Sequence, residues 1–329
     1  MKEQLLKIFQ DHQGEYISGE KISQELGCSR TAVWKHIEEL RKNGYQLDSA
    51  PRKGYRMVMR ANGIHTHEIK QYLTTKFLGR ELTYFDATES TQQIAHKLAQ
   101  DGVEEGHVVV ANEQTKGKGR LGRVWHSRSN TSISMSMILR PPLPPQKTPQ
   151  LTLLAAVAVV QAIKKNTGLQ CEIKWPNDIL LKGKKLVGIL TEMQADPDLV
   201  HSVIIGIGLN VNQTSEDFGE DIAHLATSLY LEKDGASGEP VDRARLIADI
   251  LLEFEELYEE YLENGFQSIR PLWESYSISV GTYIYARMIK DVIYGYAKGI
   301  TDDGVLLVED ESGKTHHIYS ADIEIDPSK

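Results

Sequence analysis

The chain has little cysteine, and it has no apolar run long enough to span a bilayer. Its 329 residues include two cysteines, Cys28 and Cys171, which form neither a Cys-x-x-Cys pair nor a disulfide framework. This cysteine usage predicts a protein of a reducing cytoplasm. The apolar stretch 151–160 is too short for a membrane span, and no secretory signal is expected at the N-terminus. A membrane is therefore not predicted as a partner.

Several catalytic and metal-binding patterns are also missing. His65 and His67, and likewise His316 and His317, have no Cys or acidic partners at zinc spacing, so no metal site is predicted. No Ser-His-Asp or Cys-His grouping suggests a covalent nucleophile. The net charge is −9, yet residues 1–65 hold eleven Lys and Arg against eight Asp and Glu, which leaves −12 for the remainder. A basic head on an acidic body predicts nucleic-acid contact by the head alone.

The most distinctive stretch is 117–125, GKGRLGRVW, in which three glycines alternate with three cations. Glycine lets backbone N–H groups approach an anion closely, and Arg adds a planar fork that fits phosphate or carboxylate. The glycines match G-x-G-x-x-G, but a dinucleotide site needs a helix next, whereas a loop is predicted at 124–130 and a strand at 133–139. Walker A spacing is also present, but Arg123 and Val124 stand where Lys and then Ser or Thr are required. A flexible basic surface loop is the alternative to an anion-binding loop.

A second stretch, 174–178 (KWPND), is followed by 182–192, KGKKLVGILTE. Together with the glycine stretch, these residues resemble the biotin–protein ligases, whose hallmarks are a G-R-G-R-x-G-R loop, a K-W-P-N-D turn and a K-L-x-G-I-L strand. All three occur here in order over roughly eighty residues, and linked motifs are far more specific than any one alone. Lys118 replaces the first Arg of the loop. The resemblance extends to both ends of the chain and is closest for the bifunctional form, which joins a biotin ligase and a biotin operon repressor in one polypeptide.

The first 65 residues are predicted to form a winged helix-turn-helix domain. Amphipathic helices are expected at 2–12, after Ser18, and after Ser29 as N-cap up to a stop at Asn43 and Gly44. Short strands at 45–47 and 55–58 flank a basic wing tip. The residues predicted to contact DNA, at the start of the third helix and on the wing, are Ser29, Arg30, Thr31, Trp34, Lys35, Arg52 and Lys53. The alternative is a small helical protein-interaction domain whose charges are merely solvated.

The expected fold class is α+β and multidomain. The resemblance implies a winged helix-turn-helix domain at 1–65, a central α/β mixed-sheet ligase domain at 66–270, and an SH3-like small β-barrel at 271–329. In the central domain the pattern predicts strands at 82–85, 108–112, 133–139, 171–175, 186–193 and 203–208. It predicts helices at 66–77, 91–100, 151–166, 222–231 and 243–263. The acidic run 253–263 is interpreted as a solvated helix face.

The resemblance also assigns site residues. Those implied to bind biotin are Ser90, Thr91, Gln92, Gln114, Gly117, Lys118, Gly119, Arg120, Lys185, Gly206 and Gly208. Those implied to bind the adenylate are Arg120, Arg123, Trp125, Asn177, Asp178, Lys185 and Asn210. Lys185, Arg120 and Arg123 are the implied catalytic residues. For two groups a structural role is the alternative: Ser90 or Thr91 can cap the following helix, and the two glycines of 206–208 can serve only close strand packing.

The activity that the resemblance implies is ATP-dependent and requires Mg²⁺. The protein would form biotinyl-5′-AMP, transfer biotin to a lysine of carboxylase carrier domains, and repress biotin genes as an operator-bound homodimer with the adenylate as corepressor. Two other activities are possible from the same motifs. A lipoyl ligase is disfavoured by the arginine-rich loop and KWPND, and a non-enzymatic repressor is disfavoured by the presence of Lys185, Arg120 and Arg123.

Overall fold

The computed structural model describes residues 1–12, 15–42, 45–59, 62–233 and 238–329. The chain divides into two compact units, Met1–Glu68 and Ile69–Lys329. The domain limits expected at 1–65, 66–270 and 271–329 stay predictions. Among the described residues, every helix is too short or too polar to cross a membrane.

The first unit contains three helices and a β-hairpin, as the sequence predicts. The helices are α1 (Lys2–Asp11), α2 (Gly19–Leu26) and α3 (Arg30–Lys42), and the strands are β1 (Gln46–Ala50) and β2 (Gly54–Met59). Ser29 caps α3, because its Oγ accepts a hydrogen bond from the backbone N–H of Ala32 at 3.2 Å. The apolar faces of the helices form one core that includes Leu5, Ile22, Ile37 and Leu47. The helix stop expected at Asn43 and Gly44 lies outside the described residues.

The second unit is built on a seven-stranded mixed sheet in the order β3-β4-β7-β11-β10-β9-β8. The strands are β3 (Leu82–Phe85), β4 (Val108–Ala111), β7 (Ser132–Leu139), β8 (Glu172–Lys174), β9 (Asp178–Leu181), β10 (Lys184–Ala195) and β11 (Val200–Asn210). Only the pair of β3 and β4 is parallel among these neighbours. The mixed sheet was predicted, although β9 was not, because its four residues follow a turn directly and carry no alternation of their own.

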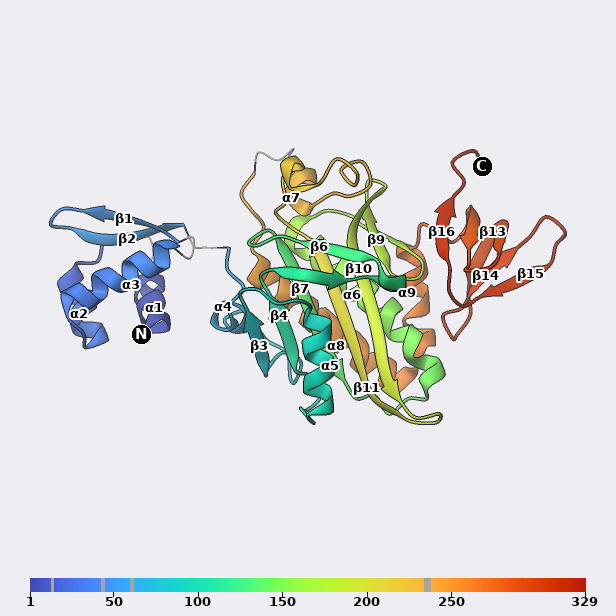
Figure 1. Ribbon diagram of the computed structural model, residues 1–329, viewed down its shortest axis with the longest axis horizontal. Coiled ribbons are helices and arrows are strands. Elements are labelled where there is room, and N and C mark those ends of the chain that lie inside the picture. The colour runs from blue at the N-terminus through green and yellow to red at the C-terminus, as the bar shows by residue number, and fades with distance from the viewer. Residues whose placement is uncertain (13–14, 43–44, 60–61, 234–237) are drawn as a thin grey trace. The chain divides into compact units, whose positions relative to one another are not determined.

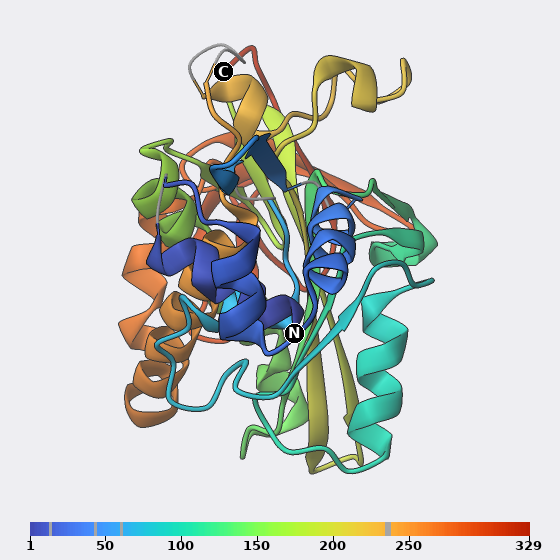
Figure 2. The same ribbon diagram turned by 90° about the vertical axis from the view of Figure 1, so that its left-hand side faces the viewer.

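Helices cover the two faces of this sheet unequally. On one face, α5 (Thr91–Gln100) packs Ala95 and Ala99 against Ile138 and Ile204. On the other lie α6 (Thr148–Thr167) and α8 (Arg243–Asn264), and Figure 2 shows α5 and α8 on opposite sides of the strands. Because α6 is apolar on nearly all sides, it is buried between α8 and the sheet. A pocket lies on the same face of the sheet as α5, beside the start of that helix.

Residues 124–127 form a strand, so the predicted loop at 124–130 is wrong over these four residues and holds at 128–130. β5 (Gln114–Lys118) pairs with β6 (Val124–Ser127), and a single 3₁₀ turn, Arg120–Gly122, joins them. Leu121 and Gly122 both have positive φ there. Val124 and His126 are exposed, so the strand has no apolar alternation by which the sequence could reveal it. In Figure 1 this hairpin crosses in front of β10 and β11.

Three other local predictions need correction. The helix expected at 66–77 ends at Lys70 as α4 (Thr66–Lys70), and the helix expected at 222–231 is confined to α7 (Leu229–Glu232). The acidic run on α8 is not wholly solvated, because the Glu255 side chain is only 2% exposed. Its carboxylate accepts hydrogen bonds from the backbone N–H groups of residues 76–78. These donors come from a segment almost 180 residues away in sequence, so charge pattern alone could not identify them.

The C-terminal part, where an SH3-like small β-barrel is expected, forms a small antiparallel sheet. After α9 (Arg270–Tyr276), five strands pair in the order β15-β14-β13-β12-β16. They are β12 (Tyr283–Arg287), β13 (Val292–Ile300), β14 (Leu306–Glu309), β15 (Thr315–Ile318) and β16 (Asp322–Ile325). Trp175 joins this sheet to the central domain, because its indole N–H donates to the carbonyl of Gly304 at 3.1 Å.

Candidate functional site

A pocket of about 380 Å³ lies on the α5 face of the central sheet. Its walls are the start of α5, the first half of β10, the C-terminal end of β11, and the hairpin of β5 and β6. The predicted biotin and adenylate residues that line it are Ser90, Thr91, Gln92, Gln114, Lys118, Gly119, Arg120, Arg123, Trp125, Asn177, Asp178, Lys185, Gly206, Gly208 and Asn210. Gly117 does not line it: a Cβ at this position would meet the carbonyl oxygen of Trp125 across the hairpin. The structure thus brings together residues that lie up to 120 positions apart in sequence.

Ser90 provides a buried polar atom that faces this pocket without a partner. The residue occupies the N-cap position of α5, yet its side chain makes no capping hydrogen bond. Ser90 is 1% exposed, and its Oγ has no hydrogen-bond partner among the described residues. The side-chain cap allowed for in the sequence analysis is therefore not formed. Since buried hydroxyls almost always find a partner, a ligand that accepts or donates a hydrogen bond here would satisfy Ser90.

The neighbouring polar residues hold one another in place. Thr91 donates its backbone N–H to Oε1 of Gln114 at 2.8 Å, and its Oγ1 lies 2.9 Å from Oγ of Ser136. Ser136 in turn donates to Oε1 of Gln92 at 3.0 Å. The Gln92 amide donates to the carbonyl of Ile204 at 3.2 Å. This uncharged network fixes the polar end of the pocket in one arrangement.

The glycines of the floor lie beneath large side chains. A Cβ at Gly206 would come within 2.5 Å of Oε1 of Gln92, and one at Gly208 would come within 2.5 Å of Nε1 of Trp125. Gly188 lies under the same indole ring, and a Cβ at this position would lie 3.0 Å from Cζ3 of Trp125. Trp125 therefore lies flat on the sheet because two neighbouring strands carry glycine beneath it. Its buried indole nitrogen is, like Ser90, without a partner among the described residues.

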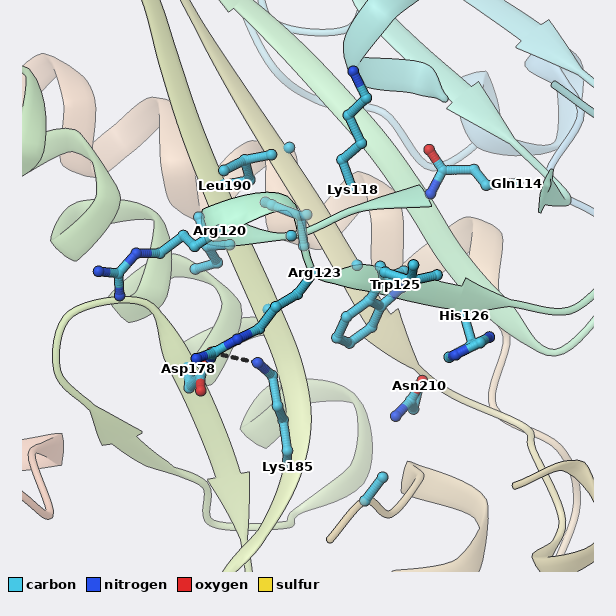
Figure 3. Close-up of a pocket in the computed structure, with 18 of the residues that line it drawn as sticks. Gln114, Lys118, Arg120, Arg123, Trp125, His126, Asp178, Lys185, Leu190 and Asn210 are labelled. Carbon is cyan, nitrogen blue, oxygen red and sulfur yellow. Dashed lines mark ion pairs between the residues drawn. The ribbon is translucent and has the colours of Figure 1, made fainter. Parts of the chain in front are cut away.

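Three cations meet at the other end of the pocket, and each has a polar partner. Nζ of Lys185 lies 2.7 Å from Oδ1 of Asp178 and 5.9 Å from the centre of the Trp125 ring. The dashed line in Figure 3 marks the ion pair of Lys185 and Asp178. Arg123 forms an ion pair with Asp322. Hydrogen bonding and charge attraction from Asp322 raise the pKa of Arg123. The pKa of Asp322 is lowered, although burial, the largest single influence, opposes its ionisation. The bond from Arg123 and the positive charges of Arg123, Arg120 and Lys174 together outweigh the effect of burial.

Arg120 is held differently, by two uncharged partners. Its guanidinium donates to Oδ1 of Asn177 at 2.8 Å and to Oγ of Ser320 at 2.8 Å. Burial lowers the pKa of Arg120, although it stays in the range where the side chain is charged. Lys118, by contrast, extends away from the Lys185 and Asp178 pair in Figure 3.

Several lining residues were not predicted from the sequence. Asp322 comes from the C-terminal sheet, Arg128 follows β6, and Asp217 lies in the 3₁₀ turn Ser215–Asp217. Arg128 and Asp217 form an ion pair at 3.1 Å that joins two segments at the pocket edge. Phe218 lies beside them in the lining. The sequence signal for this part of the lining was the polar composition of 213–219, because no motif includes Arg128, Asp217 or Phe218.

The predicted DNA-contacting residues are exposed on the first unit. Arg30, Thr31, Trp34 and Lys35 are exposed near the start of α3, and Trp34 is 52% exposed despite its size. Arg52 and Lys53 are exposed at the turn between β1 and β2, where Arg52 adopts a positive φ of 65°. An exposed helix start with a basic hairpin tip matches the geometry that reads a DNA groove and its phosphates.

Comparison with known families identifies three regions of this chain. Residues 84–210 match the biotin/lipoate A/B protein ligase family. Residues 2–56 match an HTH domain family, and residues 287–326 match the biotin protein ligase C terminal domain.

Known proteins resemble the chain over nearly its whole length. The bifunctional ligase/repressor BirA of Bacillus spizizenii is 54% identical over 99% of this chain and 98% of its own. The protein of the same name from Escherichia coli is 26% identical over 91% and 89%. Among solved structures, a biotin protein ligase from Aquifex aeolicus in complex with biotin and ATP has 29% identity and a TM-score of 0.63. That comparison covers 75% of this chain and 99% of the Aquifex chain.

Proposed function

The chain belongs to the biotin/lipoate A/B protein ligase family, as a bifunctional ligase and repressor, and we propose that the pocket on its central sheet makes biotinyl-5′-AMP. The observation that carries this proposal is the division of one pocket into two ends. One end is neutral and holds the hydroxyl of Ser90, which has no hydrogen-bond partner in the described part of the chain. The other end holds Lys185, Arg120 and Arg123. A neutral ureido ring with an apolar tail suits the first end, and a phosphoryl group suits the second.

The charges follow from the chemistry of the first step. A carboxylate oxygen of biotin attacks the α-phosphorus of ATP, the P–O bond to the β-phosphate breaks, and diphosphate leaves. Both reactants are anions, so cations must neutralise them and hold them in line. We place Lys185 between the carboxylate and the α-phosphate, because it projects into the pocket between Asp178 and Trp125. Asn177 and Asp178, both in the KWPND turn, support Arg120 and Lys185 respectively.

The arginines would exchange partners when the nucleotide binds. Arg123 is paired with Asp322, and Arg120 with Ser320, so the C-terminal sheet holds both guanidinium groups at the pocket edge. A phosphate oxygen offers each of them a stronger, charge-assisted partner. We propose that this exchange closes the hairpin of β5 and β6 over the adenylate and excludes water, which would otherwise hydrolyse the mixed anhydride.

Mg²⁺ belongs to the proposal through the carboxylates of the pocket. Asp178, Asp217 and Asp322 line it, while the described residues contain no group of three acidic, His or Cys side chains that could form a metal cage. This set fits Mg²⁺, which keeps several waters and binds through one or two carboxylates plus substrate phosphates. When bound, the ion supplies charge neutralisation on the polyphosphate.

In the second step a carrier lysine attacks the biotinyl carbonyl carbon as a neutral amine. An amide bond forms, the bond from carbon to the phosphate oxygen breaks, and AMP and a proton leave. The carrier domains of biotin-dependent carboxylases are the proposed acceptors. Because biotinyl-AMP can be supplied directly, the transfer step can be measured separately from adenylate formation.

The repressor function resides in the first unit and is proposed to act as a homodimer on operator DNA. One winged module offers a small contact area, and repressors of this type usually bind two half-sites across a two-fold axis. We propose that bound adenylate orders the segments at 117–130 and 213–219 and thereby favours the dimer, so that the reaction intermediate serves as corepressor. Linkage then requires dimer formation to tighten adenylate binding by the same factor.

One assay tests the ligase proposal directly. The protein is mixed with ATP, Mg²⁺, labelled biotin and a biotin carboxyl carrier domain, and label on the carrier lysine is the expected product. Lys185→Ala should slow single-turnover biotinyl-AMP formation by roughly 100- to 1,000-fold, since a lost electrostatic donor costs about 3–4 kcal/mol. A wild-type protein that labels no carrier, or attaches lipoate and not biotin, would refute the assignment.

A second assay tests the coupling of the two functions. Operator affinity is measured with and without biotin plus ATP, and sedimentation is measured in both states. Tighter operator binding and a dimer are expected when the adenylate is present. Equal DNA affinity in the two states would exclude the corepressor role without affecting the ligase assignment.

A further inference from the structure

The main chain of Lys185 is held by a segment that no sequence motif marks. The backbone N–H of Lys185 donates to the carbonyl of Leu225 at 2.7 Å, and the Lys185 carbonyl accepts from the N–H of Thr227 at 3.0 Å. Ala226 forms a parallel β-bridge with Lys185 between these two bonds. We call residues 225–232 the Lys185 strap. Because Lys185 lies beyond the region where β10 pairs with β11, which begins at Val187, the strap takes the place of the missing strand.

The position of Lys185 in its own hairpin makes this support important. The register of β9 and β10 shifts between Lys185 and Val187, so a bulge lies directly beside the lysine. A bulge disrupts the ladder and re-aims nearby side chains. The two strap hydrogen bonds are therefore what hold the Lys185 backbone on the side facing away from β9. The direction in which its ammonium group projects depends on them.

The strap is anchored by buried side chains at its centre. Thr227, Ser228 and Leu229 are each at most 1% exposed. Oγ1 of Thr227 donates to Oε1 of Glu232 at 2.7 Å, and Oε2 of Glu232 lies 2.8 Å from Nζ of Lys182. Lys182 lies at the turn that joins β9 to β10. The strap thus grips both the backbone of Lys185 and the tip of the hairpin that carries it.

Asn210 belongs to the same anchor. Its Nδ2 donates to the carbonyl of Thr227 at 3.0 Å, and its Oδ1 accepts from Nε2 of Gln213 at 3.0 Å. Oγ of Ser228 donates to the carbonyl of Gln213 at 2.6 Å. Both polar atoms of the Asn210 side chain are therefore engaged within the protein. We therefore infer that the main role of the Asn210 side chain is to hold the strap, whereas the resemblance implied contact with the adenylate.

From these contacts we propose that the Lys185 strap, anchored by Thr227, Glu232 and Asn210, is a positioning element for Lys185 in adenylate formation. The proposal rests on the proposed function, because it acts through the role assigned to Lys185. Displacing a catalytic group by about 1 Å costs up to roughly 100-fold in rate. Gln213 contacts the strap through Ser228, so the segment at 213–219, which we propose to cover the adenylate, is connected through the strap to the catalytic lysine.

The test separates the two half-reactions. Glu232→Gln removes the carboxylate that holds Thr227 and Lys182. We expect single-turnover biotinyl-AMP formation to slow by about 10- to 100-fold. Transfer from supplied biotinyl-AMP to a carrier lysine should stay within about twofold, because that step does not need Lys185 against the α-phosphate. Glu220→Gln makes the same chemical change at an exposed residue that does not line the pocket, and it should alter neither rate.

A double-mutant cycle shows whether the strap acts through Lys185. In a Lys185→Ala background, Glu232→Gln should slow adenylate formation by no more than about twofold further, since the positioned group is already gone. Thr227→Val cuts the same anchor from its other end, and Thr227→Ser, which keeps the hydroxyl, should restore the rate. This pair keeps the test valid if Glu232→Gln lowers the melting temperature below the assay temperature.

Three results would overturn the strap proposal. They are an unchanged rate of adenylate formation in both Glu232→Gln and Thr227→Val, an equal loss in both half-reactions, and a full additional loss in the Lys185→Ala background. A wild-type protein that makes no biotinyl-AMP would instead refute the proposed function, and the strap proposal with it. Normal wild-type activity with unaffected strap variants would overturn the strap proposal alone.

Discussion

Replacing Gly208 with Ala tests whether the Trp125 indole must lie flat on the sheet. A Cβ at Gly208 would lie 2.5 Å from Nε1 and 2.9 Å from Cζ2 of the indole. Ordinary van der Waals contact needs about 3.5 Å, so the ring must rise by about 1 Å or the strands must move. Gly188 lies under the same ring on the neighbouring strand, but its Cβ would be 3.0 Å from the nearest ring atom, Cζ3. Gly188→Ala therefore requires a shift of only a few tenths of an ångström and serves as the matched control.

The expected magnitude follows from the size of the overlap. Overpacking a fitted site costs about 1–3 kcal/mol, and each 1.4 kcal/mol is a factor of ten in affinity. Because Gly208 has no positive φ, Ala meets no backbone strain there and the cost comes from the indole alone. We expect Gly208→Ala to weaken binding of a non-hydrolysable biotinyl-AMP analogue by roughly 10- to 100-fold. Gly188→Ala should weaken it by less than about fivefold.

Titration calorimetry with this analogue measures both variants, and thermal melting without ligand reports any loss of fold stability. The ratio of the two affinities is the informative quantity, since both variants add one methyl group to the same floor. Equal affinities, or weaker binding by Gly188→Ala, would show that the indole does not form the wall of the adenylate site. Trp125 would then be a packing residue of the hairpin.

Three further predictions concern the charged residues. Glu255→Gln should lower the free energy of unfolding, measured by urea titration, by about 2–4 kcal/mol, because an amide cannot accept from all three backbone donors. The same change at the exposed Glu256 should alter it by less than about 0.5 kcal/mol. The pKa of Asp322 is lowered in the fold, so its pair with Arg123 stabilises above the ordinary Asp pKa of about 3.9 and loses that effect as pH falls through the lower folded value. Wild type and Asp322→Asn should thus differ by at most about 1 kcal/mol at pH 7. The difference should shrink as the pH falls below the ordinary Asp pKa, and a gap that widens on acidification would contradict the pairing. Arg120→Gly removes the bonds to the KWPND turn and the C-terminal sheet and should release adenylate that labels bystander lysines. A filter assay measures retention of biotinyl-AMP, and retention equal to that of wild type would contradict this prediction.

Local sequence determined the elements whose signals repeat over short distances. The helix at 91–100 has the predicted ends, because its apolar period and its preceding polar residues are both local. The third helix of the first unit begins after its Ser29 cap for the same reason. The GKGRLGRVW stretch places glycines and cations within a few residues, and KWPND supplies a rigid turn. Both stretches were predicted to belong to the site, and residues of both line the pocket.

Tertiary structure decided what depends on partners far away in the chain. Glu255 looks like a surface residue by charge pattern, yet backbone N–H groups of 76–78 make it a buried clamp. Asp322 looks like an ordinary strand residue, yet it holds Arg123 of the glycine stretch from the C-terminal sheet. The hydrogen bonds between the strap and Lys185 involve main-chain atoms, so the pattern of side chains could not predict them. Sequence specifies which chemical groups are available, whereas long-range packing and pairing decide which of them are left free to meet a substrate.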